Sequence, residues 1–228
     1  MSEAAPGIPD PAAYTTPERA ELAGAIRALI DTVMSVEDVD AETLRTTARE
    51  VEQLTFRLGR GRDEGPGYRP RSHSDYLPRS PIVGEASPLS PRLDWEVVTR
   101  ADGGTGVEAR GTFGAAYEGP PTFVHGGWVA CAFDEILGIA NIVSGHPGMT
   151  ARLTVHYRRP TPLFRELRLR AWVDRVEGRR VMSRAEMFDG DTLTAEADGL
   201  FVQPRPEVAA RYFGIPADGR TRDLEELD

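Results

Sequence analysis

The chain contains no lysine, because all 27 of its basic residues are arginine. This absence excludes a lysine Schiff base and a phosphate-binding loop that depends on lysine. It has one cysteine, Cys131, so no disulfide can form within the chain. We find neither a signal-peptide start nor an apolar stretch long enough to span a bilayer. We therefore expect a cytoplasmic protein with no membrane partner.

Positive charge is also scarce. Acidic residues outnumber basic ones by 36 to 27, which gives a formal net charge of −9. Such a surface does not attract phosphate backbones, so we expect no nucleic-acid partner. The 228 residues suffice for one globular domain with an appendage, or for two small domains.

Two amphipathic helices are predicted near the amino terminus, after a proline-rich lead at residues 1–13. Thr16 can cap the first helix and Pro17 suits its first turn. The second helix is expected to start near Asp40 and to stop at Gly59. Apolar residues recur at helical spacing in both: Leu22, Ile26, Leu29 and Val33 in the first, and Leu44, Ala48, Val51, Leu54 and Leu58 in the second.

Proline, glycine and arginine are dense in residues 61–92, which predicts a surface loop or linker. The chain then divides into a tail with a helical hairpin (1–60), this linker (61–92), a domain (93–204) and an acidic tail (205–228). Isolated short helices are marginal in water, so we expect the hairpin to pack against the domain or to support oligomerisation.

Alternating apolar and polar residues after position 93 predict an antiparallel sheet of about five or six strands. One apolar segment, residues 128–143, interrupts it. Only Asp134, Glu135, Gly138 and Asn141 in that segment are not apolar, and a helix apolar nearly all round is a buried one. This indicates an α+β fold in which the sheet wraps around the helix. The strands are expected at 94–100, 107–113, 150–159, 166–176, 180–188 and 192–202.

Two adjacent carboxylates in a buried helix are unusual, because burying an ionised carboxylate without partners is costly. Neighbouring helical residues point about 100° apart. We therefore expect one of Asp134 and Glu135 to face a cleft and the other to face a structural partner.

The helix begins at His125-Gly126-Gly127, after two prolines. Unpaired N–H groups beside glycines at a helix start can approach a ligand oxygen and stabilise negative charge, as in an oxyanion hole. His125 and Gly127 are then candidates for contact with a substrate. The alternative is that the glycines only allow a tight turn and that His125 packs or caps the helix.

Gly126 and Asp134 are eight residues apart, about 12 Å along a helix. That is too far for both to act on one carbonyl within a single chain. Two copies with their central helices antiparallel would bring the start of one helix to the middle of the other, forming two equivalent sites. We therefore expect a homodimer, and a dimer of dimers stays open.

The motifs in residues 94–203 resemble those of the hotdog-fold acyl-CoA thioesterases, in particular the phenylacetate-pathway and thioesterase-superfamily-member-4-like group. The matching motifs are Glu118-Gly119-Pro120-Pro121, His125-Gly126-Gly127, Asp134 nine positions after the histidine, Thr150, the run Tyr157-Arg158-Arg159-Pro160-Thr161-Pro162-Leu163, and Ala195-Glu196-Ala197 before Phe201-Val202.

The resemblance implies a hotdog fold, a curved sheet around a central helix, here with an N-terminal helical extension. It implies hydrolysis of an acyl-CoA thioester to free acid and CoA at a dimer interface. Asp134 would be the general base or nucleophile, the Gly126 N–H the oxyanion donor, and Thr150 the residue that orients water or the carboxylate. We expect Trp128 and Phe133 to shield Asp134 partly from water. No metal or organic cofactor is expected beyond the CoA of the substrate.

Other chemistries find less support. The Gly-x-Ser-x-Gly motif is absent, Cys131 falls in the buried helix, and the four histidines show no metal-ligand spacing. Two alternatives stay open because fold does not settle function. One is a non-catalytic module that binds acyl-CoA or an acyl carrier, and the other is a hotdog hydratase or dehydratase.

Overall fold

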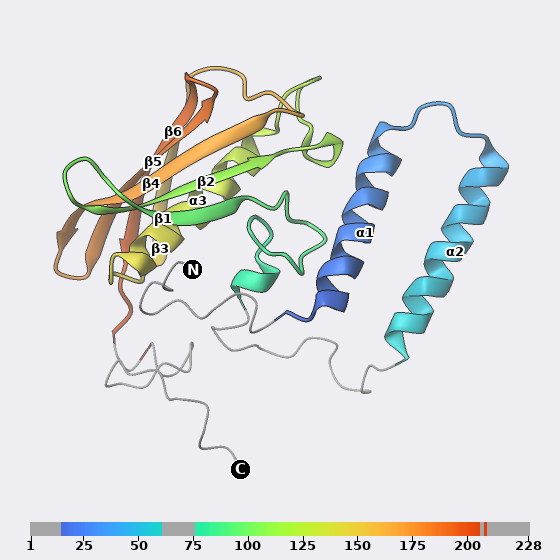
Figure 1. The fold of residues 1–228 in the computed structure, drawn as a ribbon, viewed down its shortest axis with the longest axis horizontal. Helices are drawn as coiled ribbons and strands as arrows, with labels where there is room; N and C mark the ends of the chain where they lie inside the picture. The colour runs from blue at the N-terminus through green and yellow to red at the C-terminus, as the bar shows by residue number, and fades with distance from the viewer. Residues whose placement is uncertain (1–14, 61–75, 206–207, 209–228) are drawn as a thin grey trace, which may run out of the picture.

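A six-stranded antiparallel sheet curves around one helix at the centre of the computed structural model, which describes residues 15–60, 76–205 and 208 (Figure 1). The strand order is β1-β2-β4-β5-β6-β3. The predicted sheet and central helix are confirmed, with strand ends within two residues of those expected. The elements are β1 (Asp94–Thr99), β2 (Thr105–Thr112), α3 (Gly126–Val143), β3 (Met149–Tyr157), β4 (Glu166–Glu177), β5 (Arg180–Asp189) and β6 (Thr192–Val202).

The core lies between α3 and the concave face of the sheet. Phe133, Ile136 and Leu137 on α3 are fully buried, as are Leu167 on β4 and Met187 on β5. By length and composition α3 could cross a membrane, so the expectation that no stretch is long enough was wrong. α3 is this apolar because it lies in the core, and a helix covered on most sides is apolar nearly all round.

Tight turns fix the register of the last three strands. Glu177 lies opposite Arg180 and Asp189 lies opposite Thr192, which leaves two-residue loops between the strands. Each loop begins with a glycine, Gly178 or Gly190, at φ of 59° and 57°. Glycine reaches this left-handed conformation without steric cost, and the predicted hairpins form.

Both predicted N-terminal helices form, α1 (Pro17–Ser35) and α2 (Ala41–Gly59), and both begin at the expected caps. The Thr16 side chain accepts a hydrogen bond from the Arg19 N–H, and the Asp40 carboxylate accepts bonds from the N–H groups of Glu42 and Thr43. Each cap satisfies donors that the first helical turn cannot pair.

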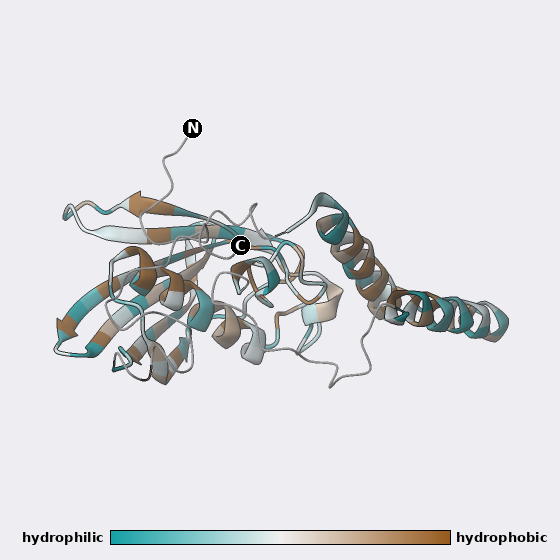
Figure 2. Ribbon diagram, turned by 90° about the horizontal axis from the view of Figure 1, so that it is seen from below, coloured by the Kyte–Doolittle hydropathy of each residue, from teal (hydrophilic) through white to brown (hydrophobic). Residues whose placement is uncertain are grey.

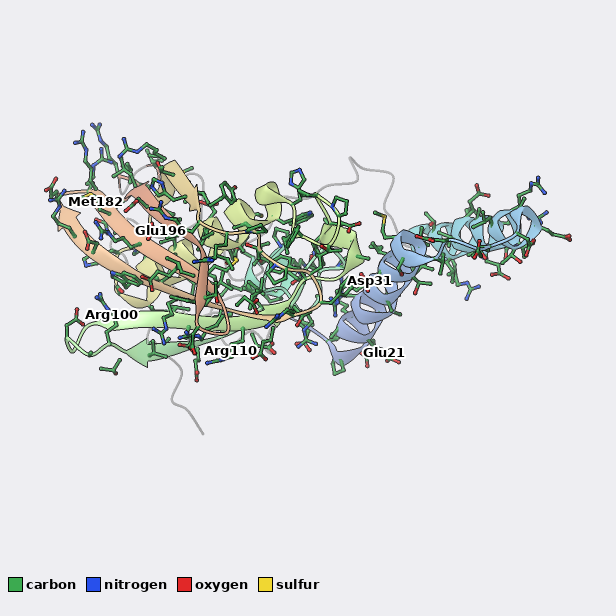
Figure 3. The ribbon with its side chains drawn as sticks, turned by 90° about the horizontal axis from the view of Figure 1, so that it is seen from above. Glu21, Asp31, Arg100, Arg110, Met182 and Glu196 are labelled. Carbon is green, nitrogen blue, oxygen red and sulfur yellow. The ribbon has the colours of Figure 1, made fainter. Side chains whose placement is uncertain are left out.

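α1 docks on the domain through polar contacts. The Arg27 guanidinium donates to the carbonyls of Glu85 and Ser87, at 3.2 and 2.7 Å. Asp31, where α1 meets the domain in Figure 3, accepts a bond from the Ala116 N–H at 3.3 Å. α2 continues beyond α1, away from the sheet, and has no buried residue (Figure 2).

The second half of the segment expected as a linker packs into the domain. A 3₁₀ helix, η3 (Leu77–Arg79), leads to Ser80, Ile82 and Ser90, all with no exposed surface. The Ser90 hydroxyl donates to the Ile82 carbonyl at 2.7 Å, so the buried polar groups are paired. The expected lead at 1–13, the first half of the linker at 61–75 and nearly all of the acidic tail lie outside the described residues.

Candidate active site

His125 caps the start of α3. Its Nδ1 accepts a hydrogen bond of 2.9 Å from the Gly127 N–H. A neutral imidazole that accepts at Nδ1 carries its proton on Nε2. His125 therefore caps the helix, which was the alternative to contact with a substrate. The Gly127 N–H bonds to His125 and is not available to a substrate.

Gly126 supplies the one backbone donor that this cap leaves over. Within the described residues its N–H has no acceptor, while its carbonyl accepts a 2.8 Å bond from the Tyr157 hydroxyl on β3. A Cβ at Gly126 would lie 3.2 Å from the Tyr157 oxygen, closer than ordinary contact. Glycine therefore lets Tyr157 approach and leaves an unpaired N–H at the positive end of a helix.

Asp134 and Thr150 form the second half of the site. The Thr150 hydroxyl, on β3, donates to Asp134 Oδ1 at 2.8 Å. No other protein donor to Asp134 is present in the described part of the chain. Asp134 is half-buried and Thr150 is exposed, so the second carboxylate oxygen is left for solvent or substrate.

An open cavity of about 580 Å³ contains both Asp134 and Thr150. Trp128 and Phe133, which we expected to shield Asp134, do not line it. Phe133 is in the core, and Trp128 packs edge-on against Tyr117 with ring centroids 5.1 Å apart. Apolar side chains from α3 and the ends of β3 and β6 line the cavity instead: Ile139, Ile142, Met149 and Phe201.

Glu135 is the carboxylate with a structural partner. It is buried, with 8% of its surface exposed, and its Oε2 accepts a 2.6 Å bond from the Tyr76 hydroxyl. Burial raises the pKa of the Glu135 carboxyl, and the Tyr76 bond opposes that shift. Burial also raises the pKa of Tyr76, as does the nearby Glu135 charge.

The two adjacent carboxylates thus diverge, Asp134 toward Thr150 and Glu135 toward Tyr76, although both also line the cavity. Sequence reasoning missed Tyr76. It lies 59 residues from Glu135, at the end of a stretch whose composition indicates only a loop.

Within one chain the two halves of the site stay apart. Asp134 and Thr150 lie at the middle of α3 and the start of β3, whereas Gly126 and Tyr157 lie at the start of α3 and the end of β3. The helix between Gly126 and Asp134 rises about 12 Å. A carbonyl held by one half is out of reach of the other half of the same chain.

The competing nucleophile and metal chemistries gain no support from the geometry. Burial raises the pKa of the half-buried Cys131 thiol, and nearby Glu135 and Asp134 raise it further, so little thiolate forms at neutral pH. No group of three or more histidine, cysteine or acidic residues suited to a metal occurs among the described residues. His73 lies outside them.

Residues 122–196, which include the helix start, Asp134 and Thr150, match the family model of the thioesterase superfamily. The central helix α3 and the strands β3, β4 and β5 lie wholly inside this match. The acyl-coenzyme A thioesterase THEM4 of Xenopus laevis is 36% identical over 95 residues, 41% of this chain and 43% of the relative. Mouse THEM4 is 35% identical over 96 residues, 41% of each chain. The chain thus spans less than half the length of these curated relatives.

The similarity to a solved structure extends beyond residues 122–196. The crystal structure of the thioesterase superfamily protein RHA08564 superposes with a TM-score of 0.69 and 29% identity. The match covers 81% of this chain and 94% of that one. Residues 93–204 are about half of the 228 residues, so the match includes part of the chain outside that range.

Proposed function

We propose that this protein hydrolyses an acyl-CoA thioester to a free acid and CoA. The observation that carries the proposal is the hydrogen bond from Thr150 to Asp134 inside a cavity of about 580 Å³. The similarity of residues 122–196 to the thioesterase superfamily, and of 95 residues of the chain to the acyl-coenzyme A thioesterase THEM4 of Xenopus laevis, supports the choice of substrate.

Asp134 is the group that activates water in this proposal. Thr150 holds Oδ1 and thereby orients the carboxylate, leaving Oδ2 to take a proton from water as its oxygen attacks the thioester carbon. The tetrahedral intermediate then expels the CoA thiolate, which accepts the proton that Asp134 took from water, so the carboxylate is regenerated. In the nucleophilic variant, Asp134 itself attacks the thioester carbon and expels the CoA thiolate, and water then cleaves the resulting anhydride. A thiolate leaves readily, so the proposed reaction requires no metal or organic cofactor.

The developing oxyanion needs a donor, and the unpaired Gly126 N–H is well suited to that role. A preorganised N–H at this point of the reaction typically lowers the barrier by about 3 kcal/mol. Gly126 of the same chain is too far from Asp134. In the proposed homodimer the donor is therefore the N–H of the partner subunit's Gly126.

The position of β3 supports such a dimer. β3 is an edge of the described sheet, with Thr150 near its start beside Asp134 and Tyr157 at its end beside Gly126. A two-fold axis near the middle of β3 would place the Asp134 end of each protomer beside the Gly126 end of its partner. It would also pair an otherwise open sheet edge.

The test is thiol release from a panel of acyl-CoAs that differ in chain length and in the presence of a ring, for the wild type and Asp134→Ala. We expect turnover in the wild type and a loss on the order of 10²-fold or more in Asp134→Ala. Asp191→Asn, in the exposed β5–β6 turn, is the matched control and should retain activity. Equal turnover in wild type and Asp134→Ala rejects the assignment. Acyl-CoA binding without release in the wild type would favour the non-catalytic module instead.

A further inference from the structure

The helix α2 carries an apolar stripe that no described part of the chain covers. Leu44, Val51, Leu54 and Leu58 are between 39% and 60% exposed, and no residue of α2 is buried. They are spaced by seven, three and four residues, which places them at the a and d positions of a heptad repeat, with Thr47 at the remaining d position. This is the seam pattern of a two-stranded coiled coil.

α1 does not cover the apolar stripe of α2. The two helices make almost no contact with each other and are separated by a gap in the view of Figure 1. α1 is held on the domain by Arg27, Asp31 and the buried Ala23. The residues that flank its own apolar stripe at the e and g positions carry no charge between Ala23 and Thr32. α1 therefore offers no partner to the charges beside the α2 stripe.

The charges beside the α2 stripe are Glu50 and Arg57, both at g positions and both exposed. In an antiparallel coiled coil, g residues face the g residues of the other helix, whereas in a parallel one they face e residues. If a second α2 lay antiparallel to the first, Glu50 of each helix would lie beside Arg57 of the other, which gives two ion pairs. In parallel orientation Glu50 would face the uncharged Thr55.

We propose that α2 binds α2 of a second copy of this chain, antiparallel, about a two-fold axis between Glu52 and Gln53. In this register Val51 packs on the partner's Leu54, and Glu50 pairs with the partner's Arg57. A shift by one heptad in either direction sets Glu50 against the partner's Glu50 or Arg57 against the partner's Arg57. The charge pattern thus selects both the orientation and the register.

This contact lies on a different part of the chain from the β3 edge and does not depend on the proposed activity. Each contact is two-fold and self-complementary. If both form, two pairs of protomers join into a dimer of dimers. The α2 contact is then the one that joins the pairs.

Charge reversal tests the proposal on the full chain by analytical ultracentrifugation. Glu50→Arg or Arg57→Glu turns two attractive pairs into two repulsive ones, and we expect association through α2 to weaken on the order of tenfold or more. The double variant Glu50→Arg/Arg57→Glu restores opposite charges and should restore association. Glu52→Arg and Arg49→Glu, on α2 away from the g positions, are the matched controls. Association unchanged by either single reversal overturns the proposal.

Disulfide trapping tests the orientation, in a Cys131→Ala background. A mixture of Val51→Cys and Leu54→Cys proteins should cross-link to each other under mild oxidation, because these positions face each other in the antiparallel register. Each variant alone should cross-link weakly. Efficient cross-linking of Val51→Cys with itself would indicate parallel helices and overturn the proposed register. Absence of any intermolecular cross-link, with unchanged circular dichroism, would overturn the α2 contact.

Discussion

The Tyr76 hydroxyl donates a 2.6 Å hydrogen bond to Glu135, the residue next to Asp134 on α3. This bond fastens the segment before β1 to the central helix. It also supplies a donor to a buried carboxylate, whose other oxygen, Oε1, has no partner in the described part of the chain. The wall of the cavity beside Asp134 therefore depends on a contact between distant parts of the sequence.

Tyr76→Phe should destabilise the fold. The substitution keeps the ring but removes the hydroxyl that donates to Oε2 of the buried Glu135, and an unsatisfied buried acceptor typically costs about 1–3 kcal/mol. Urea unfolding at neutral pH measures the change. Tyr157→Phe, which removes a hydroxyl bonded to an exposed helix start, is the comparison and should cost less. Equal losses for both variants would contradict a special role for the Tyr76 bond.

Glu135→Gln should change how stability depends on pH. The pKa of Glu135 is raised in the folded protein above its ordinary value of 4.5, so the native state holds the proton more tightly than the unfolded chain does. The resulting stabilisation is present below pH 4.5 and is lost as the pH rises through the folded pKa. Glutamine stays neutral and still accepts from Tyr76.

The free energy of unfolding of Glu135→Gln, minus that of the wild type, should therefore increase as the pH rises from about 4.5 to 7. Chemical denaturation at several pH values measures this difference. Glu52→Gln, on the exposed α2, is the control and should show a smaller dependence. A difference that is constant over this range, or that falls with pH, contradicts the assignment of a raised pKa to Glu135.

Thr150→Val should lower kcat for thioester hydrolysis on the order of tenfold, because Asp134 loses the donor that fixes Oδ1. KM should change less, since the methyl groups of valine keep the shape of the cavity wall. Thr150→Ser retains a hydroxyl and should recover most of the activity. Steady-state thiol release separates the two parameters. If serine is no better than valine, the hydrogen bond is not what matters at this position.

Local sequence patterns predicted the parts of the fold that short-range physics determines. Alternation located the strands, and Thr16 and Asp40 marked the helix starts, because a cap acts within three residues. The divergence of Asp134 and Glu135 follows from helix geometry alone.

These local patterns could not predict contacts between residues far apart in the sequence. The Tyr76 contact spans 59 residues, and the burial of Ile82 depends on a segment whose composition favours loops. Trp128 was misplaced because its facing partner, Tyr117, is set by the tertiary fold. The resemblance predicted Asp134 and Thr150 as site residues, but only the coordinates show that the Gly127 N–H is already used by His125.

Gly126→Ala should reduce kcat strongly while leaving the fold intact. The added Cβ would lie 3.2 Å from the Tyr157 oxygen, so the helix start or Tyr157 has to shift, and the proposed oxyanion donor moves with it. Loss of one such donor typically costs 10²- to 10³-fold in kcat, about 3 kcal/mol. The matched glycine on the same helix is Gly138, where a Cβ meets nothing within 4 Å, so Gly138→Ala should stabilise α3 by about 0.5–1 kcal/mol. Thermal unfolding and thiol release on both variants separate the effects. A Gly126→Ala protein with wild-type kcat would show that the oxyanion is stabilised by another donor.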